Sequence, residues 1–144
     1  LAADPDPRAR ALDLAGAHAR LFLGVGGRRS APPCASAWLS GRGLVCQEEA
    51  GAAAADLARL DFRLADDFRE PPDHVAVLLS AMAALVERGD AAAQAAHLDA
   101  RLLSWIGAFR DACAAGDRQG FYAAAARALV GFCAADRALL ARRV

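Results

Sequence analysis

Five stretches of the chain repeat apolar residues at intervals of three and four positions, which is the spacing of one face of an α-helix. We therefore expect helices over about 7–23, 45–60, 72–89, 91–116 and 118–139, with one further helical turn at 36–39. The connections at 24–33 and 61–70 show no such period and are expected to be irregular loops. No longer repeat is found, so the pattern indicates one helical domain rather than an array.

Some residues at the helix ends favour particular boundaries. Asp6 and Pro7 suit the N-cap and the first position of the first helix. We expect the third helix to begin at Pro72, with Asp73 in its first turn, where a negative charge is favourable beside the helix dipole. The fourth helix is expected to bend at Gly107. These signals place a proline-rich junction between a loop and a helix.

The composition supports an all-α fold. The 144 residues include 40 Ala and 19 Leu, against seven Val, one Ile and no Thr. Ala and Leu are strong helix formers, whereas β-branched residues favour strands. The length also suits one domain. We therefore expect a single-domain helical bundle of about five helices over residues 1–144.

The composition also argues against several classes of function. The 17 basic residues are all Arg and are balanced by 17 acidic residues, so the basic excess expected of a nucleic-acid-binding protein is absent. Without Lys the chain has no P-loop and no lysine base. Charged residues interrupt every apolar stretch before it reaches the roughly 20 residues that span a bilayer, so we expect no stable membrane insertion.

The four cysteines, Cys34, Cys46, Cys113 and Cys133, are widely scattered. None lies at a spacing typical of a zinc site, so we expect no bound metal. In an Ala-rich helical domain of this size, cysteines more often serve as small buried apolar residues than as disulfide partners. We therefore expect reduced, structural thiols.

The densest cluster of functional side chains is Glu70-Pro71-Pro72-Asp73-His74. The two prolines restrict the backbone, so the acids and the imidazole would be held near the free N–H groups of a helix start. A purely structural interpretation, in which Glu70 and Asp73 cap the helix and His74 is a half-buried helix residue, accounts for the same pattern. A catalytic interpretation would make His74 a general base oriented by Asp73, but neighbours on a helix point about 100° apart and no nucleophile motif is present.

Charge is distributed unevenly along the chain. Residues 48–73 contain eight acidic residues and three arginines, whereas both ends of the chain lean positive. Such a run is most often a solvated surface. Beside two irregular loops it could also attract a cationic peptide, whose apolar part would lie against Trp38, Phe68 or Val75. The residues alone leave both interpretations open.

The order of these motifs resembles the TorD/DmsD family of redox-enzyme maturation chaperones. The run 70–74 and the helix after it resemble the family's E-P-x-D-H signature, and residues 21–24 resemble its LF-x-G segment. Residues 32–38 resemble a P-P-W-G-S-x-Y loop, in which Cys34 and Ala35 replace Trp and Gly and the aromatic residue reappears at Trp38. Residues 102–109 resemble an L-x-x-W-x-x-x-F helix, so the similarity extends along essentially the whole chain.

The resemblance implies a cytoplasmic chaperone without catalytic activity. It would bind the twin-arginine signal peptide and the apo form of a molybdenum-cofactor oxidoreductase, as a monomer or a domain-swapped dimer, until the cofactor is inserted. It implies no cofactor of the chaperone's own, although guanine nucleotide binding has been linked to the family. The peptide contacts that we expect are Glu70, Pro71, Pro72, Asp73, His74, Trp38, Val75, Ser36 and Phe68.

Two alternatives and one structural expectation accompany this interpretation. A NarJ-like chaperone would assemble nitrate reductase. Such a chaperone often recognises a client protein that lacks an exported leader. A small helical enzyme or ligand-binding protein would use His74, His18 or His97. Family members usually carry one or two further helices before the segment that matches the start of this sequence, so we expect those helices to be missing here and an apolar groove to be exposed.

Overall fold

The computed structural model of the protein describes residues 6–41, 43–65 and 68–142. The elements are α1 (Pro7–Phe22), η1 (Gly27–Arg29), α2 (Ser36–Leu39), α3 (Glu48–Arg59), α4 (Val75–Arg88), α5 (Ala91–His97), η2 (Leu98–Leu103), α6 (Ile106–Gly116) and α7 (Phe121–Ala141). The described residues contain no β-strand beyond a single bridge between Cys34 and His74. The predicted all-α fold is therefore confirmed.

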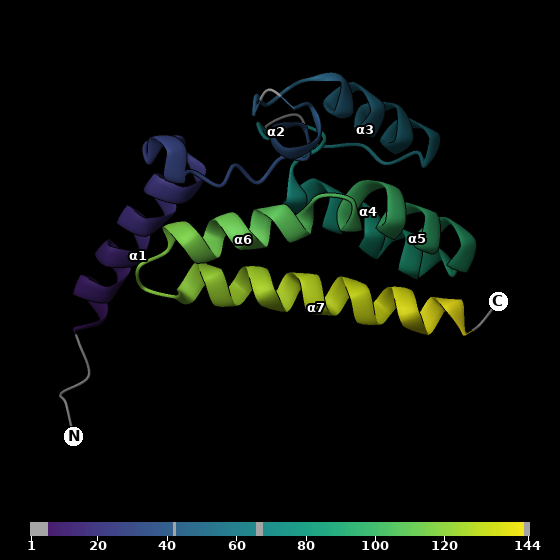
Figure 1. Ribbon diagram of the computed structural model, residues 1–144. Coiled ribbons are helices and arrows are strands. Elements are labelled where there is room, and N and C mark those ends of the chain that lie inside the picture. Colours follow the sequence, from purple (N-terminus) through teal and green to yellow (C-terminus); the bar gives the residue numbers. More distant parts are fainter. Residues whose placement is uncertain (1–5, 42, 66–67, 143–144) are drawn as a thin grey trace.

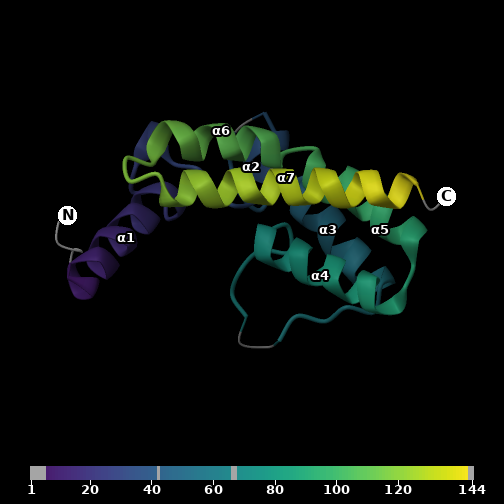
Figure 2. The ribbon, with the colours of Figure 1, turned by 90° about the horizontal axis from the view of Figure 1, so that it is seen from below.

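The helices pack in layers around one core. α6 and α7 form an antiparallel hairpin along one side of the molecule, and α1 lies near the end where that hairpin turns (Figures 1 and 2). α4 and α5 lie beside the hairpin, and α2 and α3 cover the side opposite α7 (Figure 1). The core contains large side chains from α4, η2, α6 and the junction before α6, among them Leu78, Leu102, Trp105 and Ile106. Burial of these apolar groups is the main force that holds the layers together.

Several predicted helix ends agree with the structure. α1 begins at Pro7, and the side chain of Asp6 accepts a hydrogen bond from the Arg8 N–H. The single turn predicted at 36–39 is α2. α4 ends where Gly89 adopts a φ of 70°, a left-handed conformation that is favourable for glycine. Local sequence preferences therefore determine these boundaries.

The prediction of one continuous helix over 91–116 was wrong. The chain passes from α5 into the π-helical segment η2 and breaks at Trp105, whose φ is −139°, rather than bending at Gly107. In an α-helix the Trp105 N–H would donate to the Arg101 carbonyl; here it donates to the Leu102 carbonyl, and the Trp105 indole N–H donates to Arg101 instead, at 2.7 Å. The buried indole thus takes the place of a backbone donor and interrupts the helix.

The third helix was predicted to begin too early. It begins at Val75 rather than at Pro72, so Asp73 is not in its first turn and His74 is its N-cap. The cause is tertiary: the Val75 N–H donates to the Pro33 carbonyl at 2.8 Å, which holds this segment beside the loop before α2. The start of α4 is therefore set by its neighbour in space.

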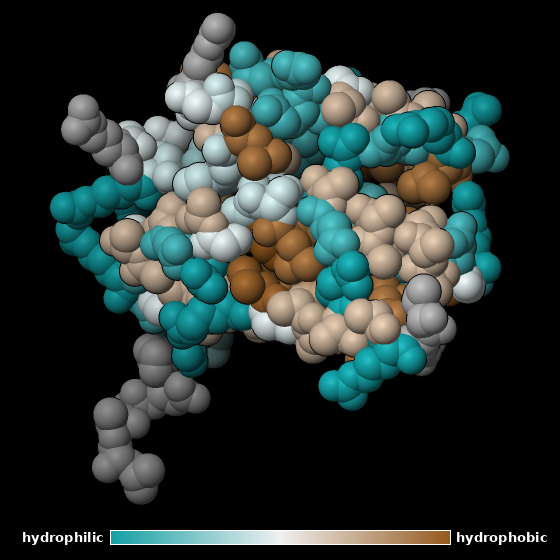
Figure 3. Space-filling view, turned by 45° about the vertical axis from the view of Figure 1, so that its right-hand side comes forward, coloured by the Kyte–Doolittle hydropathy of each residue, from teal (hydrophilic) through white to brown (hydrophobic). Residues whose placement is uncertain are grey.

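α7 presents large apolar side chains to solvent. Phe121, Phe132 and Leu139 are 55%, 65% and 53% exposed. On the face seen in Figure 3, hydrophobic residues form separate patches between hydrophilic ones. Within the parts of the chain that the structure describes, no helix combines the length and apolar character needed to cross a bilayer.

Candidate functional site

Two proline-containing segments, 32–36 and 70–75, lie side by side at the start of α4. The Ala35 N–H donates to the Asp73 carbonyl at 3.1 Å, and the bridge between Cys34 and His74 continues the pairing. The Trp38 indole N–H donates to the Pro32 carbonyl at 2.9 Å, which fixes α2 against the same loop. Two motifs separated by about forty residues of sequence therefore form one structural unit.

Asp73 is the buried link of this unit. Its side chain is 1% exposed, and Oδ2 accepts a hydrogen bond from the Ser36 N–H at 2.7 Å, at the start of α2. Ser36 is also fully buried, and neither its hydroxyl nor Asp73 Oδ1 has a hydrogen-bond partner among the described residues. The expectation that Asp73 and Ser36 touch a peptide therefore does not agree with the geometry, because both are inside the protein. Their position suits them to hold the two loops together.

His74 caps α4. Its Nδ1 accepts a hydrogen bond from the Ala76 N–H at 3.1 Å. The motif therefore caps the helix, as the structural interpretation expected, but the capping residue is His74 rather than Glu70 or Asp73. Burial lowers the pKa of His74, against the opposing effects of Glu70 and Asp73, which favours a neutral ring. The His74 Nε2 lies 3.8 Å from Glu70 Oε2. A neutral imidazole does not neutralise the charge of Glu70.

An open cleft of about 530 Å³ lies in front of these side chains. Of the predicted contacts, Glu70, Pro71, His74 and Val75 line it. Its other lining residues come from α1, from the loops at 32–34 and 45, and from α6 and α7: they are His18, Phe22, Leu23, Pro32, Pro33, Cys34, Val45, Phe109 and Tyr122. The cleft is mostly apolar, and among the described residues Glu70 is the one acidic side chain that lines it.

The remaining predicted contacts lie outside this cleft. Trp38 is half-buried and packs its ring against Phe109, with 6.3 Å between the ring centroids, so it supports the cleft wall. Phe68 is 41% exposed, but neither Phe68 nor Pro72 is among the lining residues. Asp66 and Asp67, which contributed to the predicted acidic surface, lie outside the described residues.

Sequence reasoning missed the aromatic wall of the cleft. Phe22 and Tyr122 pack edge to face with 5.1 Å between centroids, and His18 lies 5.2 Å from Phe22. The Tyr122 hydroxyl donates to the Leu14 carbonyl at 3.2 Å, which joins α7 to α1. Phe22 and Tyr122 are about a hundred positions apart in sequence, so their contact has no local signal. The one available sign was an aromatic residue at the end of α1 and another at the start of α7.

Asp73 and His74 do not form the catalytic pair that the motif could suggest. The Asp73 carboxylate is directed to Ser36 and His74 is engaged as a helix cap, so the pair does not act as a dyad. Burial, assisted by Asp73, raises the pKa of the Cys34 thiol to about 12, which keeps the thiol in the cleft protonated and unreactive. All four cysteines are unpaired, and Cys46 alone among them is exposed. Among the described residues, no group of three or more His, Cys, Asp and Glu side chains could hold a metal ion.

An all-helical domain with a mostly apolar cleft and a carboxylate at its rim has the features of a site that binds another molecule. Comparison with known proteins agrees. Residues 2–111 match the family described as the nitrate reductase delta subunit. The chain is 34% identical to the chaperone protein TorD of Photobacterium profundum over 140 residues, which cover 90% of this chain and 64% of that protein.

Further relatives carry the same name. The chaperone protein TorD of Shewanella oneidensis is 33% identical over 138 residues, which cover 92% of this chain and 63% of that protein. The chaperone protein TorD of Vibrio parahaemolyticus is 29% identical over 140 residues, which cover 90% of this chain and 65% of that protein. The chain therefore belongs to the TorD/NarJ-type chaperone family, as its motifs predicted, and it spans slightly less than two thirds of the length of these relatives.

Proposed function

We propose that the protein is a cytoplasmic chaperone for one redox enzyme, and that it binds the enzyme's twin-arginine signal peptide in the cleft beside Glu70 until a molybdenum cofactor has been inserted. Family membership supports the chaperone function. The observation that carries the peptide-binding proposal is an apolar cleft of about 530 Å³ with one acidic residue at its edge. A twin-arginine leader joins basic residues to an apolar stretch, and the cleft offers a partner for each.

The Glu70 side chain is suited to receive a guanidinium. It is 53% exposed, and its neighbour His74 is kept neutral by burial. A carboxylate can accept two parallel N–H bonds from one arginine, an arrangement that gives orientation as well as affinity. The apolar part of the peptide would then lie against Phe22, Leu23 and Val45.

Isothermal titration with a synthetic twin-arginine leader tests this proposal. We expect Glu70→Gln to weaken binding roughly three- to tenfold, because a half-exposed, charge-assisted contact contributes about that much. Glu87→Gln, on an exposed position of α4 outside the cleft, is the matched control and should bind like the wild type. Equal affinities for the two variants would refute the role of Glu70.

The apolar wall has its own control pair. Leu23 and Leu12 are 66% and 68% exposed, but only Leu23 lines the cleft. Leu23→Ser should therefore weaken the peptide complex, whereas Leu12→Ser should not. The double variant Asp73→Ala, His74→Ala would be a poor test, because it removes the buried acceptor of the Ser36 N–H and a helix cap together.

Protonation of His74 should oppose peptide binding. Because its pKa is lowered, the ring is neutral at pH 7 and becomes charged only as the pH falls below the ordinary range of histidine. The imidazolium would then pair with Glu70 and compete with the peptide's guanidinium. We expect the affinity to fall on acidification, and to fall less when His74 is replaced by Gln.

A NarJ-like role is the second candidate, and the family description as a nitrate reductase delta subunit favours it. Such a chaperone would recognise a client segment without an exported leader. A leader in which both arginines are replaced by glutamine distinguishes the two. Unchanged affinity for that peptide would support recognition of a client without the arginine pair.

A further inference from the structure

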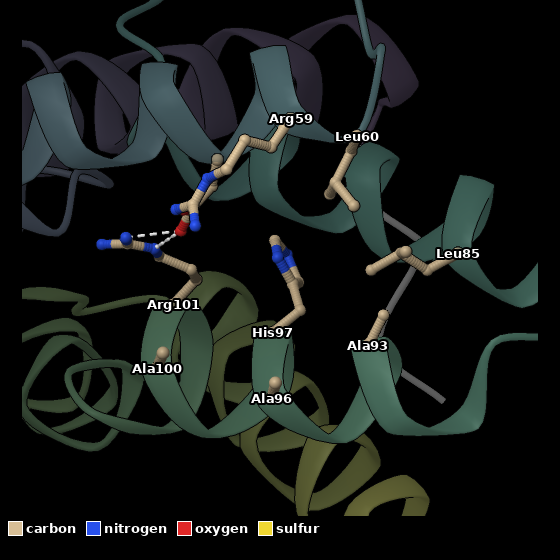
Figure 4. A pocket seen from close by; sticks show the side chains of 9 residues that line it. Arg59, Leu60, Leu85, Ala93, Ala96, His97, Ala100 and Arg101 are labelled. Carbon is tan, nitrogen blue, oxygen red and sulfur yellow. Dashed lines mark hydrogen bonds and ion pairs between the residues drawn. The ribbon is translucent and has the colours of Figure 1, made fainter.

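A second cavity lies between α3, the end of α4 and the segment formed by α5 and η2 (Figure 4). Its volume is about 240 Å³, and it shares no lining residue with the cleft beside Glu70. Apolar side chains form most of its wall: Leu60, Leu85, Ala93, Ala96 and Ala100. Four polar residues complete it: Asp56, Arg59, His97 and Arg101. The proposed peptide complex leaves this cavity without a role.

The charges gather at one end of the cavity. Arg101 of η2 and Arg59 of α3 both pair with the Asp56 carboxylate, and Figure 4 shows the side chains of Arg59 and Arg101 directed toward each other. The Arg101 side chain is 22% exposed and also donates to the Ala52 carbonyl at 3.4 Å, so it is held in place. The Arg59 side chain is 75% exposed and can reorient. Two cations share one anion, which leaves this end with a net positive charge.

His97 stands in the middle of the cavity and contributes no charge. The residue is 7% exposed, and its Nε2 donates a hydrogen bond to the Leu78 carbonyl at 2.9 Å. Burial lowers the pKa of His97, and Arg101 lowers it further against the effect of the backbone hydrogen bond, so the ring is neutral at pH 7. The cavity thus has an apolar body, a neutral ring and a cationic end.

The cavity is open to solvent on one side, so its volume indicates how much of a ligand it covers. An apolar cavity of about 150 Å³ accommodates benzene, which corresponds to roughly 25 Å³ for each heavy atom. At that density a cavity of about 240 Å³ holds a ligand of about ten heavy atoms. We propose that this cavity binds a small aliphatic monocarboxylate, with its carboxylate between Arg59 and Arg101 and its chain along Leu60, Leu85 and the α5 alanines. One negative charge satisfies the cationic end, and the hydrocarbon chain fills the apolar body.

Nuclear magnetic resonance of the imidazole rings tests the proposal with octanoate, an acid of ten heavy atoms. The chain has three histidines: His97 lies in this cavity, whereas His18 and His74 line the other cleft. Octanoate should shift the His97 resonances saturably, with a dissociation constant of roughly 0.1–1 mM for a ligand of this size. The resonances of His18 and His74 should not change. Octanol, which lacks the charge, should bind at least threefold more weakly.

Two matched pairs of variants complete the test. Arg59→Gln should weaken octanoate to about the level of octanol, whereas Arg63→Gln, also on the surface but outside the cavity, should not. Ala93→Leu should fill the cavity and abolish binding, whereas Ala92→Leu, on the exposed side of α5, should leave it intact. The proposal is overturned if octanoate leaves the His97 resonances unchanged or if only those of His18 and His74 shift. It is also overturned if Arg59→Gln or Ala93→Leu binds octanoate as well as its control variant does.

Discussion

Replacing Asp73 with Ala removes the acceptor that joins the loop before α4 to the start of α2. The Ser36 N–H donates to Asp73 Oδ2 at 2.7 Å inside the protein, so the variant leaves a buried donor without its partner. A hydrogen bond to a charged group contributes about 1.5–3 kcal/mol, and relief of the buried carboxylate's desolvation offsets part of that loss. We expect the free energy of unfolding to decrease by about 2 kcal/mol. For a chain of 144 residues this corresponds to a fall of about 6–8 °C in Tm.

Urea denaturation followed by circular dichroism at 222 nm measures the effect. Asp73→Asn keeps an acceptor oxygen of the same shape and should cost less than about 1 kcal/mol. Asp111→Ala, whose exposed side chain pairs with Arg110 on the surface, should change the free energy of unfolding by less than about 0.5 kcal/mol. If Asp73→Ala unfolds at the same urea concentration as Asp111→Ala, the buried hydrogen bond does not hold the two loops together.

Three further predictions concern the packing and the pH dependence of the fold, and each is checked by the same denaturation measurement. Gly116→Ala should cost about 1–3 kcal/mol, because an added Cβ would lie 2.7 Å from the Arg29 carbonyl oxygen; full stability would contradict this close approach. Phe109→Ala should lower the free energy of unfolding by about 3–5 kcal/mol, since Phe109 is 5% exposed. Phe132→Ala, on the surface of α7, should change it by less than about 0.5 kcal/mol. Similar losses for the two variants would mean that the outer face of α7 is covered. Burial lowers the pKa of His97, so the unfolded chain binds the proton first as the pH falls. The free energy of unfolding should therefore decrease from about pH 7 to pH 5. An equal decrease in the His97→Gln variant would exclude His97 as the cause.

Much of the fold could be predicted because it depends on local signals. The apolar period and the composition predicted an all-α domain, and the cap at Asp6 placed the start of α1. The break at Trp105 could not be predicted in this way, because it depends on where a buried indole finds a hydrogen-bond acceptor. Such a contact is a property of the packed core rather than of the helical period.

The sequence singled out residues that the structure brings together, but it did not indicate which of them are buried. Glu70 and His74 of the motif at 70–74 line the cleft, and their role as peptide contacts stays a prediction. The sequence does not show which of two nearby acids is buried: Asp73 is inside because a neighbouring loop, far away in sequence, supplies the donor for its carboxylate. The aromatic wall was missed for a similar reason, since Phe22 and Tyr122 meet only when α1 packs against α7.

The positions of the acidic residues limit how the cleft could bind the peptide that we propose. Asp56 is engaged by Arg59 and Arg101, and Asp73 lies inside the protein, so Glu70 is the one acid among the described residues that lines the cleft. A single carboxylate can orient a single guanidinium. If the cleft binds a leader as proposed, the rest of the affinity comes from the apolar wall. The hydrophobic stretch of the leader is then at least as important to recognition as its second arginine.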